Sequence, residues 1–166
     1  GRNIERLEVL KNLGIPVPII LDIKDASFIM EFIPHLDMQS FLIQNNPQLL
    51  GAFIVRILEI LESTTINSTF DFYDTYCTRL SAFPWENYNL SFQRNQLLDA
   101  LPKSLPKSEY HGDFTLDNIL FSTNHEFYLI DPLTTDYASF VFDIAKLRQD
   151  LTCKWFLRGK VHFLEG

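Results

Sequence analysis

Residues 111–118 read His-Gly-Asp-Phe-Thr-Leu-Asp-Asn, and this stretch decides most of what the sequence says about the fold. Two short apolar runs follow it, 119–121 and 127–130, and the polar residues Ser-Thr-Asn-His come directly after the first run. Apolar runs of this length on either side of a polar turn are typical of a β-hairpin. The second run ends in Ile130-Asp131-Pro132. The sequence therefore predicts a short loop that leads into a hairpin, with a further aspartate where the hairpin ends.

Three oxygen-bearing side chains of this segment are expected to converge. Asp113 and Asn118 lie at the two ends of the loop, and Asp131 ends the returning strand. Because the strands of a hairpin run antiparallel, Asp131 is expected beside Asn118. Transfer of a phosphoryl group to a hydroxyl needs a carboxylate that accepts or orients the hydroxyl proton, and oxygen ligands that hold Mg²⁺ against the phosphates. Asp113 is the candidate base, and Asn118 and Asp131 are the candidate metal ligands.

The spacing His-x-Asp-x-x-x-x-Asn, followed by a hairpin and a second Asp, resembles the catalytic segment of protein kinases. With Gly112 in the second position and Asp131-Pro132 after the hairpin, it is more similar to the aminoglycoside phosphotransferase and choline kinase family. Three other stretches are similar to the same family, namely 14–18, the interlobe hinge 29–34, and 143–147. The resemblance covers most of residues 1–151, and it implies a protein-kinase-like fold.

The resemblance also implies roles for individual residues. Asp113 would be the catalytic base, Asn118 and Asp131 the Mg²⁺ ligands, and His111 a brace for the loop. The expected ATP site consists of Met30, Glu31, Ile33, Leu120 and Ile130. Glu31 and Ile33 would meet the adenine edge through their backbones, and Leu120 and Ile130 would form an apolar floor under the base. Strand alternation agrees, since Leu120 lies two residues beyond Asn118 and so on the same face.

The rest of the chain predicts helices kept apart from strands, which indicates an α+β fold. Apolar spacing, capping residues and prolines predict helices over 3–13, 38–44, 47–63, 91–101 and 143–151, and strands over 17–22 and 27–33 with a turn at 24–26. In the last helix, Asp143 is expected as the cap, with Ile144, Leu147 and Leu151 facing inward. Residues 64–89 allow no assignment. We expect 1–33 to be a remnant of a kinase N-terminal lobe and 34–166 to be mainly its helical C-terminal lobe.

The acceptor is expected to be small. Eleven residues separate Asp131 from Asp143, and they contain no Ala-Pro-Glu. A protein kinase uses a longer segment here to dock a polypeptide. The expected function is therefore ATP-dependent phosphorylation of a hydroxyl on a small polar metabolite, such as an amino alcohol, a sugar or an aminoglycoside. The aromatic residues between 70 and 88 could line an acceptor pocket or could pack in the core.

The family's glycine-rich phosphate loop and phosphate-pairing lysine have no counterpart in the sequence. We expect the chain to be the remainder of a longer protein, since a two-strand remnant would leave a sheet edge uncovered. The alternative is a catalytically inactive kinase-like module that binds or scaffolds.

Composition restricts the partners and the compartment. The net charge of −7 argues against a nucleic-acid binder, which needs a basic face. The most apolar windows are too short or too interrupted to span a bilayer. Two cysteines far apart, without a pair at metal or redox spacing, favour a reduced cytoplasmic protein. The sequence does not predict an oligomeric state.

Overall fold

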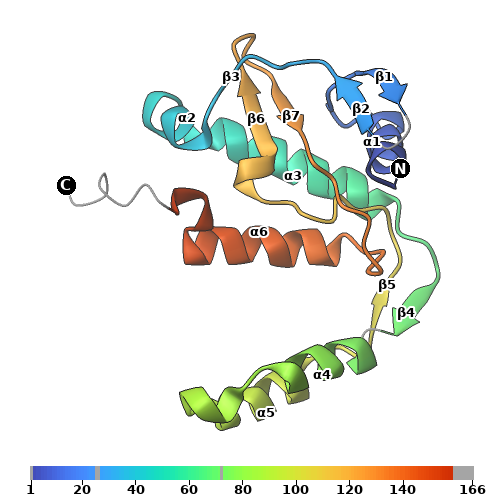
Figure 1. The fold of residues 1–166 in the computed structure, drawn as a ribbon, viewed down its shortest axis with the longest axis vertical. Helices are drawn as coiled ribbons and strands as arrows, with labels where there is room; N and C mark the ends of the chain where they lie inside the picture. The colour runs from blue at the N-terminus through green and yellow to red at the C-terminus, as the bar shows by residue number, and fades with distance from the viewer. Residues whose placement is uncertain (1, 25–26, 72, 159–166) are drawn as a thin grey trace.

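A computed structural model describes residues 2–24, 27–71 and 73–158 as a mixture of helices and small antiparallel sheets (Figure 1). The order begins α1 (Arg2–Asn12), β1 (Ile20–Lys24), β2 (Ser27–Met30), β3 (His35–Leu36), α2 (Met38–Gln44) and α3 (Pro47–Ser63). It continues with β4 (Thr69–Asp71), α4 (Tyr73–Ala82), the 3-10 turn η1 (Trp85–Tyr88), α5 (Ser91–Ala100) and β5 (Ser104–Pro106). The last elements are η2 (Leu116–Asn118), β6 (Ile119–Ser122), β7 (Phe127–Leu129), α6 (Val141–Cys153) and η3 (Trp155–Leu157).

The sheet that matters for the site is the β3-β6-β7 sheet, which contains the predicted hairpin. β6 and β7 pair with Ile119 opposite Leu129 and Phe121 opposite Phe127. The short β3, missed in the sequence, pairs antiparallel with the other edge of β6. β3 therefore joins the chain directly after the predicted hinge to the β6–β7 hairpin.

Helices α2 and α3 pack on this hairpin through aromatic rings, and α6 runs nearby (Figure 1). Phe41 of α2 is fully buried, with its ring centroid 4.6 Å from that of Phe121 and 5.3 Å from that of Phe127. Phe53 of α3 stacks on Phe127 at 4.9 Å. Edge and stacked rings add to the apolar area they bury, so these contacts hold the hairpin on the helices.

The first helices follow the apolar spacing of the sequence. In α1, Leu7 and Leu10 are buried, and Gly14 ends the turn at φ 77°, a conformation that glycine adopts without steric cost. In α3, Pro47 occupies the first turn and the Asn46 side chain accepts a hydrogen bond from Gln48 N. These helices and α2 confirm the sequence predictions within a residue or two.

Two predicted regions differ from the structure. The first predicted strand begins at Ile20 instead of Val17, and residues 25 and 26 of the predicted turn lie outside the described residues. The unassigned stretch 64–89 holds β4 and α4, and β4 pairs with the distant β5. Together α4 and α5 project away from the remaining elements (Figure 1). The β4–β5 pairing joins residues 69–71 to residues 104–106, and a contact between such distant segments is not indicated by any local sequence pattern.

Among the aromatic side chains that the structure describes between residues 73 and 88, none belongs to the main core cluster. Phe83 packs against Trp85 at 4.8 Å and against Tyr88 at 5.5 Å, at the α4–η1 junction. Tyr76 stacks on Phe142 at 6.1 Å. Phe72, part of the same expectation, lies outside the described residues.

The prediction for the last helix was wrong in two respects. α6 begins at Val141, so Asp143 lies inside its first turn and does not cap it. Ile144 and Leu151 are exposed, and the buried residues of α6 are Asp143, Leu147 and Asp150. The inward face is therefore partly made of carboxylates, which an apolar-periodicity rule assigns to solvent.

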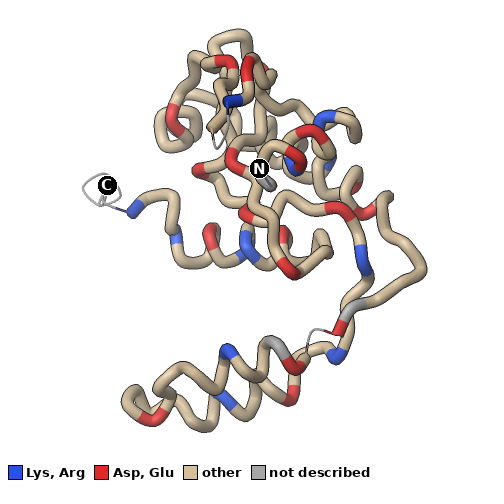
Figure 2. The backbone as a smooth tube through the Cα atoms, turned by 45° about the vertical axis from the view of Figure 1, so that its right-hand side comes forward, with Lys and Arg blue, Asp and Glu red and all other residues tan. Residues whose placement is uncertain are grey.

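The mixture of helix and sheet agrees with the α+β prediction, while the division into two lobes at residue 33 stays a prediction. Acidic positions outnumber basic ones along the backbone (Figure 2), and every Asp, Glu, Lys or Arg between Lys107 and Lys146 is acidic. Cys77 and Cys153 are both free. Within the described part of the chain, no helix is both long enough and apolar enough to cross a membrane.

Candidate active site

Asp143 holds the start of the loop at residues 111–118. Its carboxylate is 1% exposed and accepts hydrogen bonds from His111 N at 2.6 Å and from Gly112 N at 2.8 Å. A buried carboxylate is stable only where such donors replace its hydration. α6 therefore positions the two residues that precede Asp113.

Asp150, two turns later on α6, holds the end of the same loop. It is 2% exposed and accepts from Leu116 N at 2.7 Å and from Phe156 N at 2.9 Å. Residues seven apart lie on one helix face, so Asp143 and Asp150 both point at the loop. Sequence reasoning missed Asp150, although this spacing from Asp143 was a signal that could have indicated it.

His111 braces the loop from inside, as the resemblance implied. The ring is fully buried, Nε2 lies 2.9 Å from Ile130 O, and Asp113 N donates to Nδ1 at 3.3 Å. Burial lowers the pKa of His111 to about 4, so the ring is neutral near pH 7. Because Nδ1 accepts, the proton sits on Nε2, which donates to the Ile130 carbonyl.

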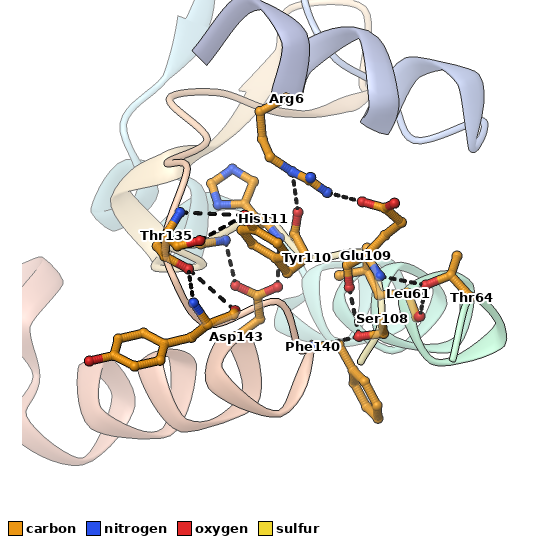
Figure 3. A network of polar contacts seen from close by, with 12 residues as sticks. Arg6, Leu61, Thr64, Ser108, Glu109, Tyr110, His111, Thr135, Phe140 and Asp143 are labelled. Carbon is orange, nitrogen blue, oxygen red and sulfur yellow. Dashed lines mark hydrogen bonds and ion pairs between the residues drawn. The ribbon is translucent and has the colours of Figure 1, made fainter. Parts of the chain in front are cut away.

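Polar contacts also anchor the segment that leads into His111 (Figure 3). Arg6 of α1 donates through Nε to Tyr110 O at 2.9 Å, forms an ion pair with Glu109, and lies 4.0 Å above the Tyr110 ring. Thr64, which follows the last residue of α3, accepts through Oγ1 from Glu109 N at 2.8 Å. Contacts from α1 and from the end of α3 thus set the approach to the loop.

Asp113 and Asn118 lie together, as predicted. Asn118 Nδ2 donates to Asp113 O at 2.8 Å and to Asp113 Oδ2 at 3.2 Å. Since the amide nitrogen is engaged by Asp113, its oxygen is left as the group that could bind a cation. The other carboxylate oxygen, Asp113 Oδ1, lies 3.1 Å from Lys146 Nζ.

Asp131 is placed beside Asn118 through the backbone. Ile130 N donates to Asn118 O at 3.0 Å, one step beyond the β6–β7 ladder. Asp131 is exposed and takes a left-handed conformation with φ 52°, which is uncommon for a residue with a side chain. Such conformations occur often at functional sites.

A family model described as "Phosphotransferase enzyme family" matches residues 2–159. The chain belongs to this family. The match confirms the resemblance to aminoglycoside phosphotransferases that the loop and hairpin indicated. A search of curated proteins and a search of solved structures found no match.

The remaining residues predicted for the nucleotide site lie on the predicted hinge and on the hairpin. Met30, Glu31, Leu120 and Ile130 are half-buried, and Ile33 is buried. Glu31 N donates to Ile19 O at 2.9 Å, and its carboxylate accepts from Ile19 N at 3.0 Å. Ile33 O accepts from His35 Nδ1 at 2.7 Å. Their convergence on one base stays a prediction.

A cavity of about 430 Å³ opens beside Asp113. It lies between the loop and the second half of α6, and its lining residues are Asp113, Thr115, Asp117, Asn118, Lys146, Gln149, Asp150, Cys153, Trp155 and Arg158. In the described residues no three His, Cys, Asp or Glu side chains form a metal cluster. The predicted ligand set consists of one amide and one carboxylate, so it is smaller than a cluster of this kind and includes an asparagine.

Residue 112 lies so close to the Leu133 backbone that the loop has no space there for a side chain. Its φ is 91°, and a Cβ there would lie 2.1 Å from Leu133 O, whose residue donates through N to His111 O at 3.0 Å. We expect Gly112→Ala to cost about 3 kcal/mol or more, measured by urea denaturation, because backbone must move.

The matched control is Gly51→Ala in α3, where an added Cβ meets nothing within 4 Å. There alanine should stabilise the protein by about 0.5–1 kcal/mol through helix propensity. Equal effects of the two substitutions would contradict the close approach at Gly112.

Asp143 makes folding stability depend on pH. Burial raises the pKa of its carboxyl to about 6, although the His111 and Gly112 N–H groups favour the ionised form. A raised carboxyl pKa means that the folded state binds the proton more tightly, so this group adds stability as pH falls. The lowered pKa of His111 acts in the opposite direction, and the two contributions offset each other in the wild type.

Asp143→Asn separates the two contributions. Between about pH 7 and pH 4, the wild type should gain about 2–3 kcal/mol in unfolding free energy relative to the variant. His111 is present in both proteins and cancels in the difference. A difference that stays constant, or shrinks on acidification, would show that the carboxyl remains ionised in the folded protein throughout.

Proposed function

We propose that this phosphotransferase moves the γ-phosphoryl group of ATP to a hydroxyl of a small polar metabolite. The observation that carries the proposal is the Asp113 carboxylate, tied to Asn118 and facing a cavity large enough for a small acceptor. Membership of a phosphotransferase family supports the class of reaction. The identities of the γ-phosphoryl donor, the metal and the acceptor are parts of the same proposal.

Asp113 is proposed as the base. A hydroxyl that enters the cavity can donate a hydrogen bond to the carboxylate, which orients the oxygen and takes its proton during transfer. Two hydrogen bonds of the Asp113 backbone hold the carboxylate in place. Asn118 Nδ2 donates to the Asp113 carbonyl, and the Asp113 N–H donates to His111 Nδ1. Positioning of this kind is a large part of catalysis by phosphotransferases.

Asn118 Oδ1 and the Asp131 carboxylate are proposed to hold Mg²⁺. The donor set fits, because Mg²⁺ in phosphotransferases takes one or two protein oxygens and fills its other positions with phosphate oxygens and water. When bound, the ion neutralises charge on the β- and γ-phosphates. The adenine edge is proposed to meet the backbone of the hinge. The N–H of Glu31 donates to Ile19 O, so the Glu31 carbonyl is the backbone group proposed to accept a hydrogen bond from the base.

The small acceptor has support from the segment between Asp131 and Asp143. Within it Leu133 N bonds to His111 O, the Tyr110 hydroxyl donates to Thr135 O at 3.1 Å, and Ser108 N bonds to Ala138 O. The segment therefore packs back against the loop and offers no extended platform for a polypeptide substrate.

A test combines acceptor screening with two conservative variants. ADP release from Mg²⁺·ATP is measured with a panel of hydroxyl acceptors, including amino alcohols, sugars and aminoglycosides. Asp113→Asn should lower kcat by about 100-fold or more, because the amide cannot take a proton. Asp131→Asn tolerates the left-handed backbone and should weaken Mg²⁺·ATP binding in a calorimetric titration.

The control is Asp136→Asn, an exposed aspartate outside the cavity lining. It should leave both readouts unchanged. Full activity in Asp113→Asn would refute the role of the base. A wild-type protein that binds no Mg²⁺·ATP would instead favour the inactive binding module.

A further inference from the structure

Each charged side chain that lines the cavity beside Asp113 has a hydrogen-bond or ion-pair partner, and the partners differ in kind. Arg158 forms an ion pair with Asp117 and lies 4.9 Å over the Trp155 ring. Asp150 accepts two backbone N–H groups. Lys146 has the Asp113 carboxylate as its partner, and its side chain remains 45% exposed. Of the two cationic residues that line the cavity, Lys146 is the one whose ammonium group contacts the Asp113 carboxylate, and an ammonium has further N–H donors to offer.

The position of Lys146 relative to Asp113 is set by the fold. Lys146 follows Asp143 by three residues on α6, and Asp143 binds the two residues before Asp113. One helical turn therefore carries both the anchor of the loop and the ammonium group. The two oxygens of Asp113 are divided between neighbours, Oδ1 toward Lys146 Nζ at 3.1 Å and Oδ2 toward Asn118 Nδ2 at 3.2 Å.

This arrangement places a cation where negative charge would build up. A hydroxyl held by the Asp113 carboxylate lies about 3 Å from it, and the phosphorus it attacks lies one bond further. An ammonium group in contact with the same carboxylate is then within reach of the oxygens of the phosphoryl group in transfer. Fixed cations aimed at such oxygens are among the largest contributions to catalysis of this reaction.

We infer that Lys146 is a further catalytic residue, whose ammonium group donates a hydrogen bond to the transferring phosphoryl group from the acceptor side. The inference rests on the proposed function. In the step, a bond forms between the acceptor oxygen and the γ-phosphorus while the bond from that phosphorus to the β–γ bridging oxygen breaks. ADP leaves with the electron pair, and the acceptor proton passes to Asp113. Lys146 keeps all its protons throughout.

The ordinary alternative is a solvated ion pair that steadies the surface of α6. Exposed pairs of this kind contribute little to stability and nothing to the binding of a phosphoryl group. The two readings therefore differ in how the protein binds a mimic of the group in transfer, and that difference can be measured without knowing the acceptor.

The experiment is a calorimetric titration of the protein with Mg²⁺·ADP, with and without aluminium fluoride, which mimics the phosphoryl group between donor and acceptor. In the wild type, aluminium fluoride should tighten Mg²⁺·ADP binding by at least about 10-fold. In Lys146→Ala the tightening should fall below about threefold, and Lys146→Arg should restore part of it because the charge is kept. Binding of Mg²⁺·ADP alone should be unchanged in both variants.

The matched control is Arg148→Ala, which removes an exposed cation from the same helix outside the cavity lining. It should keep the wild-type response, and thermal unfolding should show that both alanine variants remain folded. Wild-type tightening in Lys146→Ala, or no tightening in a wild type that binds Mg²⁺·ADP, would overturn the inference and leave the proposed function standing. A wild type that binds no Mg²⁺·ADP would overturn both.

Discussion

The candidate active site depends on one helix that turns two buried carboxylates toward the backbone of a loop. Asp143 takes the N–H groups of His111 and Gly112, and Asp150 takes that of Leu116. These N–H groups would otherwise be left unpaired, at a cost of about 1–3 kcal/mol for each one buried. Their satisfaction from α6 fixes both ends of the segment that carries Asp113. The geometry of the candidate site is thus a consequence of backbone hydrogen bonding.

The aspartates near the loop differ in burial and in their partners. Asp143 and Asp150 are buried, and each accepts two backbone N–H groups, so these carboxylates hold the loop in place. Asp113 is partly exposed and faces a cation and an amide, which leaves it accessible from the cavity. Asp131 is exposed at a left-handed backbone position beside Asn118. The four aspartates thus carry the same carboxylate in different surroundings, and burial and hydrogen-bond partners determine what each carboxylate can contact.

Much of this was readable from the sequence, and the failures have a common cause. The helices with apolar spacing, the 119–130 hairpin and the proximity of Asp113 to Asn118 all follow from local patterns. The sequence did not indicate the β4–β5 pair, the start of α6 or the anchoring role of Asp150. Each depends on a tertiary contact: a distant strand, or a carboxylate buried against a loop 30 or so positions away. Polar residues on an inward helix face look solvated until their partners are known.

Asn118 and Asp131 are proposed to share one divalent cation beside Asp113. Paramagnetic broadening of amide resonances tests this shared site, with Mn²⁺·ADP added in small amounts to isotopically labelled protein. We expect the signals of Asn118 and Asp131 to broaden first, followed by that of Asp113, while exposed residues such as Glu59 keep theirs. Broadening centred on other acidic residues, with Asn118 and Asp131 unaffected, would contradict it.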